Sequence, residues 1–245
     1  MKGYVFVPIF IVSFLISYFI YAQLLPDYIR QGGPLVVLLM VLSILTLTFI
    51  VERLITLKRA QGRGNVAAFM RNLRKSVDQG NVGDAIDSCR KQGGCLANVV
   101  GAGLERYQFL TTESALPKDE VLDETKRSIE EANALETPIL ERNLIALSTI
   151  ASIATMVGLL GTTIGMIRSF RAMGHAGAPD ATQLAVGISE ALINTAGGLS
   201  IAIIGIIMYN YFTNRVDSFN FLLDETTYEV MQQLQRKAPA GQRHG

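Results

Sequence analysis

The sequence is poor in charged residues for its length. They make up 18 % of the 245 positions, whereas a typical soluble domain carries about 25 %. The formal net charge is only +1 at pH 7, and no basic run is interleaved with aromatic residues, so nothing supports binding to nucleic acid. The low charge, together with 49 % hydrophobic residues, indicates a membrane protein.

Cysteine and histidine are also scarce, with two of each. Cys89 and Cys95 match neither a CxxC motif nor a zinc-binding spacing, so we expect two free thiols in a reducing compartment. His175 and His244 lie far apart in polar segments, and neither has a second ligand nearby in the sequence. We expect both histidines to be exposed and inert, and we expect no metal site and no cofactor.

Long apolar runs, in contrast, are prominent. Each is near or above the ~20 residues that a helix needs to cross the hydrocarbon of a bilayer, and none alternates as a barrel strand does. Because lipid offers no partner to backbone polar groups, these runs are predicted to be helices. There are four such runs: Tyr4–Ala22, Leu35–Val51, Leu144–Ile167 and Ala185–Phe212.

The first apolar run allows two interpretations. A signal peptide would have Lys2 before the apolar region and a small residue, such as Ala22, at the cleavage site. However, the apolar core of a signal peptide is usually ~7–15 residues long, and this run is longer. We favour a retained helix and keep a cleaved signal peptide as the alternative.

The distribution of basic residues predicts the orientation. Of the 22 lysines and arginines, 14 lie between Glu52 and Arg142. The short segments 23–33 and 169–184 carry one each. Since basic residues are retained on the cytoplasmic side, the middle segment and the C-terminal tail are predicted to be cytoplasmic.

The middle segment is polar and has the pattern of several helices. The fold class that we predict is all-α: a polytopic helical membrane protein whose long helices extend into a cytoplasmic helical bundle. The predicted helices are 65–76, 81–91, 95–109 and 117–142. The predicted parts are an extra N-terminal hydrophobic helix and loop (1–31), a transmembrane helix (32–57), a cytoplasmic domain (58–142), two transmembrane helices (143–213) and a cytoplasmic helix and tail (214–245).

Small and polar residues recur at helical intervals in the third and fourth runs. Ser148, Thr155 and Thr162 are seven residues apart, so they share one helix face. Gly158, Gly161 and Gly165 form a second face that suits close helix contact. Tight packing, with hydroxyl groups bonded to carbonyls of their own helix, is the simpler explanation for Ser148 and Thr155.

Acidic residues are absent from the middle of every apolar run. Glu190 lies near the outward end of the fourth run, where an ionisable group usually has a functional or assembly role. Threonine hydroxyls do not titrate near neutral pH. If the chain forms a proton path, the titrating carboxylate therefore comes from another chain, and a partner helix in a polar-lined pore is predicted.

Three motifs resemble the ExbB/TolQ group of the MotA/TolQ/ExbB proton channel family, closest to ExbB-type biopolymer transport proteins. They are Gly158–Met166 (GLLGTTIGM), Gly187–Thr195 (GISEALINT) followed by Gly197-Gly198 and Tyr209-Asn210, and Val51–Leu54 (VERL). By this resemblance, Thr162 and Thr195 are proton-pore residues and Glu190 acts in assembly or gating. Ser148, Thr155 and Asn194 are further candidates for the pore lining.

The resemblance also implies partners and a location. Members form homo-oligomers, expected to be pentamers, in the bacterial inner membrane. A single-span ExbD/TolR-like protein supplies a pore aspartate, and a TonB/TolA-like protein spans the periplasm. The sequence departs from the family where Thr155 replaces a frequent proline, Thr163 a usual apolar residue and Asn194 a usual small one.

The predicted function is that of a proton-channel subunit that couples the proton-motive force to mechanical work for outer-membrane transport. Alternatives are a TolQ-like subunit for envelope integrity, a MotA-like stator and a non-conducting membrane scaffold. An intramembrane enzyme is not expected, because no apolar run holds a histidine or a central aspartate, and the glycine-rich run lacks the GK[ST] ending of a phosphate-binding loop.

Overall fold

The computed structural model describes residues 3–23, 26–113, 116–174 and 181–237, and every regular element in these ranges is a helix. The predicted all-α fold is thereby confirmed. His175 and His244 lie outside the described residues. The chain divides into two compact units, with residues 1–53 and 143–212 in unit 1 and residues 54–142 and 213–245 in unit 2.

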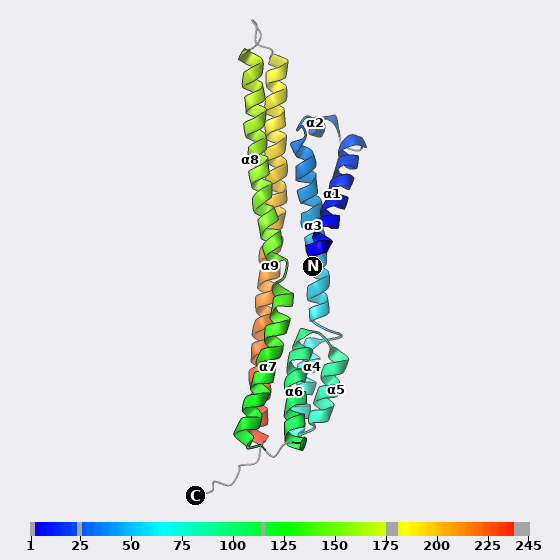
Figure 1. The fold of residues 1–245 in the computed structure, drawn as a ribbon, viewed down its shortest axis with the longest axis vertical. Helices are drawn as coiled ribbons and strands as arrows, with labels where there is room; N and C mark the ends of the chain where they lie inside the picture. Colours follow the sequence, from blue (N-terminus) through cyan, green and yellow to red (C-terminus); the bar gives the residue numbers. More distant parts are fainter. Residues whose placement is uncertain (1–2, 24–25, 114–115, 175–180, 238–245) are drawn as a thin grey trace. The chain divides into compact units, whose positions relative to one another are not determined.

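Unit 1 contains the apolar helices. They are α1 (Gly3–Gln23), the short α2 (Asp27–Arg30), most of α3 (Leu35–Ala60), α8 (Leu144–Gly174) and the first part of α9 (Ala181–Lys237). Within this unit, α8 and the first part of α9 run side by side in opposite directions, and α1 and α3 form a second pair joined through α2 (Figure 1).

Three helical stretches are long and apolar enough to cross a membrane: α3, the stretch that includes α8, and α9. This agrees with three of the four predicted runs. Many of their apolar side chains are exposed on the isolated chain, including Leu159, Ile203 and Ile207, and lipid would accommodate such side chains better than water. The first run also forms a helix, α1, but only its stretch Phe10–Gln23 stands out as an apolar helix, and it is shorter than the other three.

One face of α1 differs from the rest of this helix. Ser13 and Ser17 are buried, whereas Phe14, Leu15 and Phe19 are exposed. Residues four apart share a helix face, so the two serines mark the side of α1 that packs inside unit 1. The apolar side chains of α1 point outward, as expected of a helix that contacts lipid.

Unit 2 is a bundle of amphipathic helices. It consists of α4 (Val66–Gln79), α5 (Val82–Gln92), α6 (Cys95–Glu113), α7 (Lys118–Glu141) and the later part of α9. These bounds agree with the four predicted helices to within a few residues. Local capping explains where α4 begins and ends: Asn65 Oδ1 accepts a hydrogen bond from the amide of Ala67 at 2.9 Å, and Gly80 adopts the left-handed conformation (φ 83°) that ends many helices.

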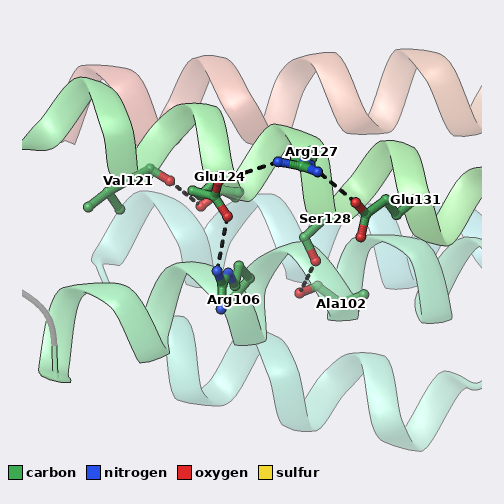
Figure 2. Close-up of polar contacts among 8 residues, drawn as sticks. Ala102, Arg106, Val121, Glu124, Arg127, Ser128 and Glu131 are labelled. Carbon is green, nitrogen blue, oxygen red and sulfur yellow. Dashed lines mark hydrogen bonds and ion pairs between the residues drawn. The ribbon is translucent and has the colours of Figure 1, made fainter. Parts of the chain in front are cut away.

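Helices α6 and α7 pack closely and are connected by polar contacts. Arg106 donates to Glu124 at 2.9 Å, and Arg127 reaches Glu131 at 3.2 Å along α7 (Figure 2). Gly103 leaves room for Ile129, because an added Cβ would overlap the Ile129 side chain. The exposed ion pairs contribute little to stability, so the apolar contact around Ile129 is the main link between the two helices.

A buried ionic contact lies near the start of α8. Arg53 is 1 % exposed, and its Nε and Nη2 donate to the carboxylate of Glu52 at 2.8 Å each. Asn143 Nδ2 donates to the same carboxylate at 3.2 Å. Asn143 has a positive φ of 67°, the only such non-glycine residue in the described part of the chain. The turn between α7 and α8 is thus connected to α3 through Glu52.

Candidate functional site

The first part of α9 packs on α8 through a seam of small residues. A Cβ added to Gly158 would lie 3.2 Å from Gly198 Cα, and one added to Gly161 would overlap Asn194. Nearer the end of α8, an added Cβ at Gly165 would lie 2.9 Å from Ala191 Cβ. Such spacing lets two backbones approach closely, as in other membrane helix pairs. The glycine face predicted from the sequence is therefore the contact face of α8.

Thr162 and Thr195 lie at the same level of this helix pair. Gly161 opposes Asn194 across the seam, and the two threonines are the next residues along each helix. Thr195 Oγ1 donates across the pair to the carbonyl of Gly158 at 3.1 Å, and Thr162 Oγ1 donates within α8 to Leu159 at 2.6 Å. Both side chains are partly exposed. The helix pair therefore presents two hydroxyl groups together at the edge of its seam.

Ser148 and Thr155 lie on the same side of α8, closer to its beginning. Thr155 is exposed and donates to the carbonyl of Ala151 at 3.3 Å. Ser148 is partly exposed, and its carbonyl accepts from Ser152 Oγ at 3.1 Å. The hydroxyl of Thr155 is thus bonded to its own helix, as the packing interpretation predicted, while its side chain stays accessible to a neighbouring chain.

Glu190 is enclosed by other parts of unit 1. It is 4 % exposed, and both carboxylate oxygens accept from Arg168 Nη1, at 2.7 and 2.6 Å. Gly33 also lies against Glu190, because a Cβ added to Gly33 would overlap the carboxylate. Gly33 has a φ of +73°, so glycine is required there both for its backbone conformation and for space. Glu190 thus links α8, α9 and the turn before α3.

Asn194 is fully buried, at 0 % exposed. Its Nδ2 donates to the carbonyls of Gly32 at 2.7 Å and Glu190 at 3.0 Å. Its Oδ1 has no hydrogen-bond partner among the described residues. In this chain Asn194 therefore fills the space beside Gly161, and its amide is enclosed by residues of the same chain.

Carboxylates do not occur in the central parts of the apolar helices. The sequence has no Asp or Glu in residues 28–51, 142–179 or 191–216. Glu52 and Glu190, which border these segments, both form ion pairs with arginines of the same chain. Apart from the buried Asn194, the polar side chains in residues 144–167 and 191–208 of α8 and α9 are hydroxyls, which exchange hydrogen bonds but do not titrate near neutral pH.

Two arginines of this region were not predicted as site residues. Arg168 pairs with Glu190, and Arg53 pairs with Glu52 inside unit 1. A general rule could have identified Arg168: a buried charge is paired, and Arg168 is one of two arginines in the last part of α8. The burial of Arg53 has no comparable signal, because an arginine beside a glutamate at a helix end is usually solvent-exposed.

Comparison with known proteins identifies the family. Residues 95–225, more than half of the chain, match the MotA/TolQ/ExbB proton channel family. The chain is 27 % identical over 208 residues to the biopolymer transport protein ExbB of Neisseria meningitidis serogroup A, covering 82 % of this chain and 92 % of that protein.

Two TolQ proteins are similar over shorter stretches. The Tol-Pal system protein TolQ of Pseudomonas aeruginosa is 36 % identical over 114 residues, covering 46 % of this chain and 49 % of that protein. The TolQ of Haemophilus influenzae is 31 % identical over 141 residues, covering 56 % and 62 %. The aligned stretch thus covers about half of the first TolQ and nearly all of the ExbB.

The part of the chain that matches the family covers α6–α8 and most of α9, which include the small-residue seam and its threonines. The chain belongs to the MotA/TolQ/ExbB proton channel family.

Proposed function

We propose that this chain is a multi-pass proton-channel subunit of an energy-transducing complex of the ExbB type in the bacterial inner membrane. It couples the proton-motive force to mechanical work on a protein that spans the periplasm, for transport across the outer membrane. The similarity to an ExbB over 92 % of that protein's length supports this choice. A TolQ-like role in envelope integrity is the second candidate, because the local identity to TolQ is higher.

The observation that carries the proposal is the pair of threonines on α8 and α9. Thr162 and Thr195 present hydroxyl groups at one level of a closely packed helix pair. Hydroxyl groups both donate and accept hydrogen bonds, so they are suited to hold water or a carboxylate along a proton path. The amide of Asn194, at the same level, is enclosed by the chain itself, and the exposed hydroxyl of Thr163 lies beside Thr162.

The titrating group of such a path has to be supplied by another chain. Neither α8 nor the part of α9 after Glu190 contains a carboxylate before residue 217, and Glu190 is paired with Arg168. A polar or ionisable group in a membrane marks a pathway when it faces an interior. The partner that the family resemblance implies, an ExbD/TolR-like single-span protein with an aspartate, meets this need. A pentameric ring of this chain around such a partner, working on a TonB/TolA-like protein, completes the proposed assembly.

Substitution of the two threonines tests the proposal. The chain is co-reconstituted with its single-span partner in vesicles, and proton uptake under an imposed potential is followed with a trapped pH-sensitive dye. Thr162→Val and Thr195→Val should each lower the proton flux by about 10- to 100-fold, the value of one hydrogen bond to a charged group. Thr163→Val is the matched control, because Thr163 donates to the same Leu159 carbonyl from an exposed position.

A second substitution at position 195 distinguishes the loss of the hydroxyl group from a change in helix packing. Thr195→Ser retains the hydroxyl group and the bond to Gly158, so it should restore most of the flux. The masses of the complexes, measured by native mass spectrometry, should be the same for all variants. If Thr195→Val conducts normally, or if Thr163→Val is equally impaired, these threonines have no special role in conduction and a non-conducting scaffold becomes the better account.

A further inference from the structure

A cleft in unit 2 is lined almost entirely by basic and glycine residues. It has a volume of about 590 Å³ and lies where the end of α3 and the following turn meet the turn between α5 and α6. No acidic residue lines it. The lining residues are Ile55, Lys58, Arg59, Gly62, Arg63, Arg90, Lys91, Gln92, Gly93 and Gly94.

Most of the positive charge in this cleft is not neutralised. Arg90 pairs with Glu105 at 2.9 Å and lies 4.0 Å from Asp87. The other four cations, Lys58, Arg59, Arg63 and Lys91, are exposed and form no ion pair within the described part of the chain. Like charges held together repel one another, so a cluster of this kind favours an anion in the cleft.

The backbone of the cleft is built from two turns held against each other. Arg63 N donates to the carbonyl of Gln92 at 2.7 Å, and Gln92 Nε2 donates to the carbonyl of Gln61 at 3.2 Å. Gly62 and Gly94 both have positive φ, and an added Cβ at Gly62 would overlap the carbonyl of Gly93. Gly93 itself has open space around it. Helix α6 begins directly after Gly94, whereas α3 and α5 end beside the cleft, so the helix dipoles largely cancel and the attraction for an anion comes from the basic side chains.

We propose that this cleft binds the phosphate of an anionic phospholipid headgroup. The source of the phosphate follows from the position of Lys58 and Arg59 in the last turn of α3, a helix long and apolar enough to cross a membrane. Lys58 is seven residues beyond Val51, the last residue of the apolar run, which is about 10 Å along the helix. The headgroup layer is about 5–7 Å thick on each side of the hydrocarbon, and the long side chains of Lys58 and Arg59 can extend back to it from this distance. This site is independent of proton conduction.

Lipid titration of the detergent-purified full chain tests the proposal. Binding of phosphatidylglycerol and of phosphatidylcholine with the same acyl chains is measured by native mass spectrometry. The unmodified chain should bind phosphatidylglycerol at least ~10-fold more tightly, because only that headgroup has a net negative charge. The double variants Arg59→Gln/Arg63→Gln and Lys58→Gln/Lys91→Gln should each lose about 25-fold in affinity, at about five-fold for each cation removed.

The matched control removes two cations from α4, outside the cleft. Arg71→Gln/Lys75→Gln changes the net charge equally, and both residues are exposed, so its affinity for phosphatidylglycerol should change by less than about two-fold. Equal affinities for the two lipids, or an equal loss in the control, would overturn the site in favour of unspecific surface charge. Tight binding of inorganic phosphate without preference for phosphatidylglycerol would overturn the assignment to lipid. Thermal unfolding measured on every variant ensures that folded chains are compared.

Discussion

At the scale of single residues, several charged and amide side chains of unit 1 bond to other groups of the same chain. Glu190 is enclosed by Arg168 and Gly33, and Asn194 bonds to the carbonyls of Gly32 and Glu190. Groups of this kind are costly in an apolar surrounding unless they are bonded. Their role in this chain is therefore to join α8, α9 and the turn before α3.

A double-mutant cycle measures how strongly Glu190 and Arg168 are coupled. Glu190→Gln and Arg168→Gln should each lower the free energy of unfolding by about 1–3 kcal/mol, because each leaves a charge without its partner. Since the side chain of Arg168 is 53 % exposed, the coupling between the two substitutions should be only about 1 kcal/mol. Thermal unfolding of the unmodified chain, the two single variants and the double variant gives this coupling energy. Strict additivity would show that the ion pair does not link α8 to α9.

The two cysteines of unit 2 should be unreactive at neutral pH. Burial raises the pKa of Cys89 from 9.0 to about 12, and Glu105 adds to this shift. Burial and then Glu136 raise the pKa of Cys95 to about 12 as well. Because the thiolate is the nucleophile, labelling at pH 8 should be roughly 1,000-fold slower in the folded chain than in denaturant. Fast labelling of the folded chain by a chromogenic disulfide reagent would contradict this.

The same shifts determine how stability depends on pH. Above pH 9 the thiols of the unfolded chain ionise while those of the folded chain stay protonated, so the folded state binds more protons and stability falls with rising pH. The stability that the protonated thiols contribute is fully present below pH 9 and is lost as the pH approaches 12.

Single residues also mark where sequence reasoning succeeded and where it failed. The face formed by Gly158, Gly161 and Gly165 could be predicted, because small residues at helical spacing have few other uses in a membrane. The burial of Asn194 could not, since a polar residue in an apolar helix is as compatible with a pore as with a packed interior. Its position depends on Gly32, 162 residues away, and helical periodicity contains no information about such contacts.

At the scale of elements, α8 and α9 form a pair in which backbone opposes backbone. A Cβ added to Gly198 would lie 2.5 Å from the carbonyl of Ala154 and 2.8 Å from Gly158 Cα. Backbone atoms of a helix cannot move aside as a flexible side chain can. The spacing of the two helices, and with it the level of Thr162 relative to Thr195, is therefore determined by the size of the residue at Gly198.

Gly198→Ala should destabilise this pair although alanine favours helices. Forcing α8 and α9 apart costs about 1–3 kcal/mol, whereas the intrinsic gain from glycine to alanine is at most about 1 kcal/mol. Gly197→Ala is the matched control, because its added Cβ would lie 3.3 Å from Leu39 Cδ1, the end of a flexible side chain. The melting temperature should fall for Gly198→Ala only. A higher melting temperature for Gly198→Ala would mean that the helices are not in close contact there.

The helices themselves were the most predictable level of the structure. The bounds of α4 to α7 follow from caps, charge patterns and the glycine pair at positions 93–94, all of which are local signals. The helix predicted after residue 213 is continuous with the fourth apolar run, since α9 extends beyond Phe212 to Lys237 in unit 2. Amphipathic positions such as Val216, Leu223 and Val230, which are buried there, sustain it by packing within the bundle.

At the scale of the whole molecule, the central parts of the apolar helices carry hydroxyl groups but no carboxylate. Together with membership in a proton channel family, this supports the proposal that a second chain supplies the titrating group. The composition of the apolar runs was enough to predict that a titrating carboxylate is missing from them. The number of copies and the choice between ExbB-like and TolQ-like partners depend on the surfaces of other chains. A single sequence contains no information about those surfaces.

Proton flux with and without the partner is the most direct test of this account. Vesicles contain either this chain alone or this chain with its proposed single-span partner, and proton uptake is driven by the same imposed potential. The account predicts flux only in the presence of the partner, and loss of that flux when the aspartate in the span of the partner is changed to asparagine. Equal flux from this chain alone would contradict the account, because the titrating group would then belong to this chain.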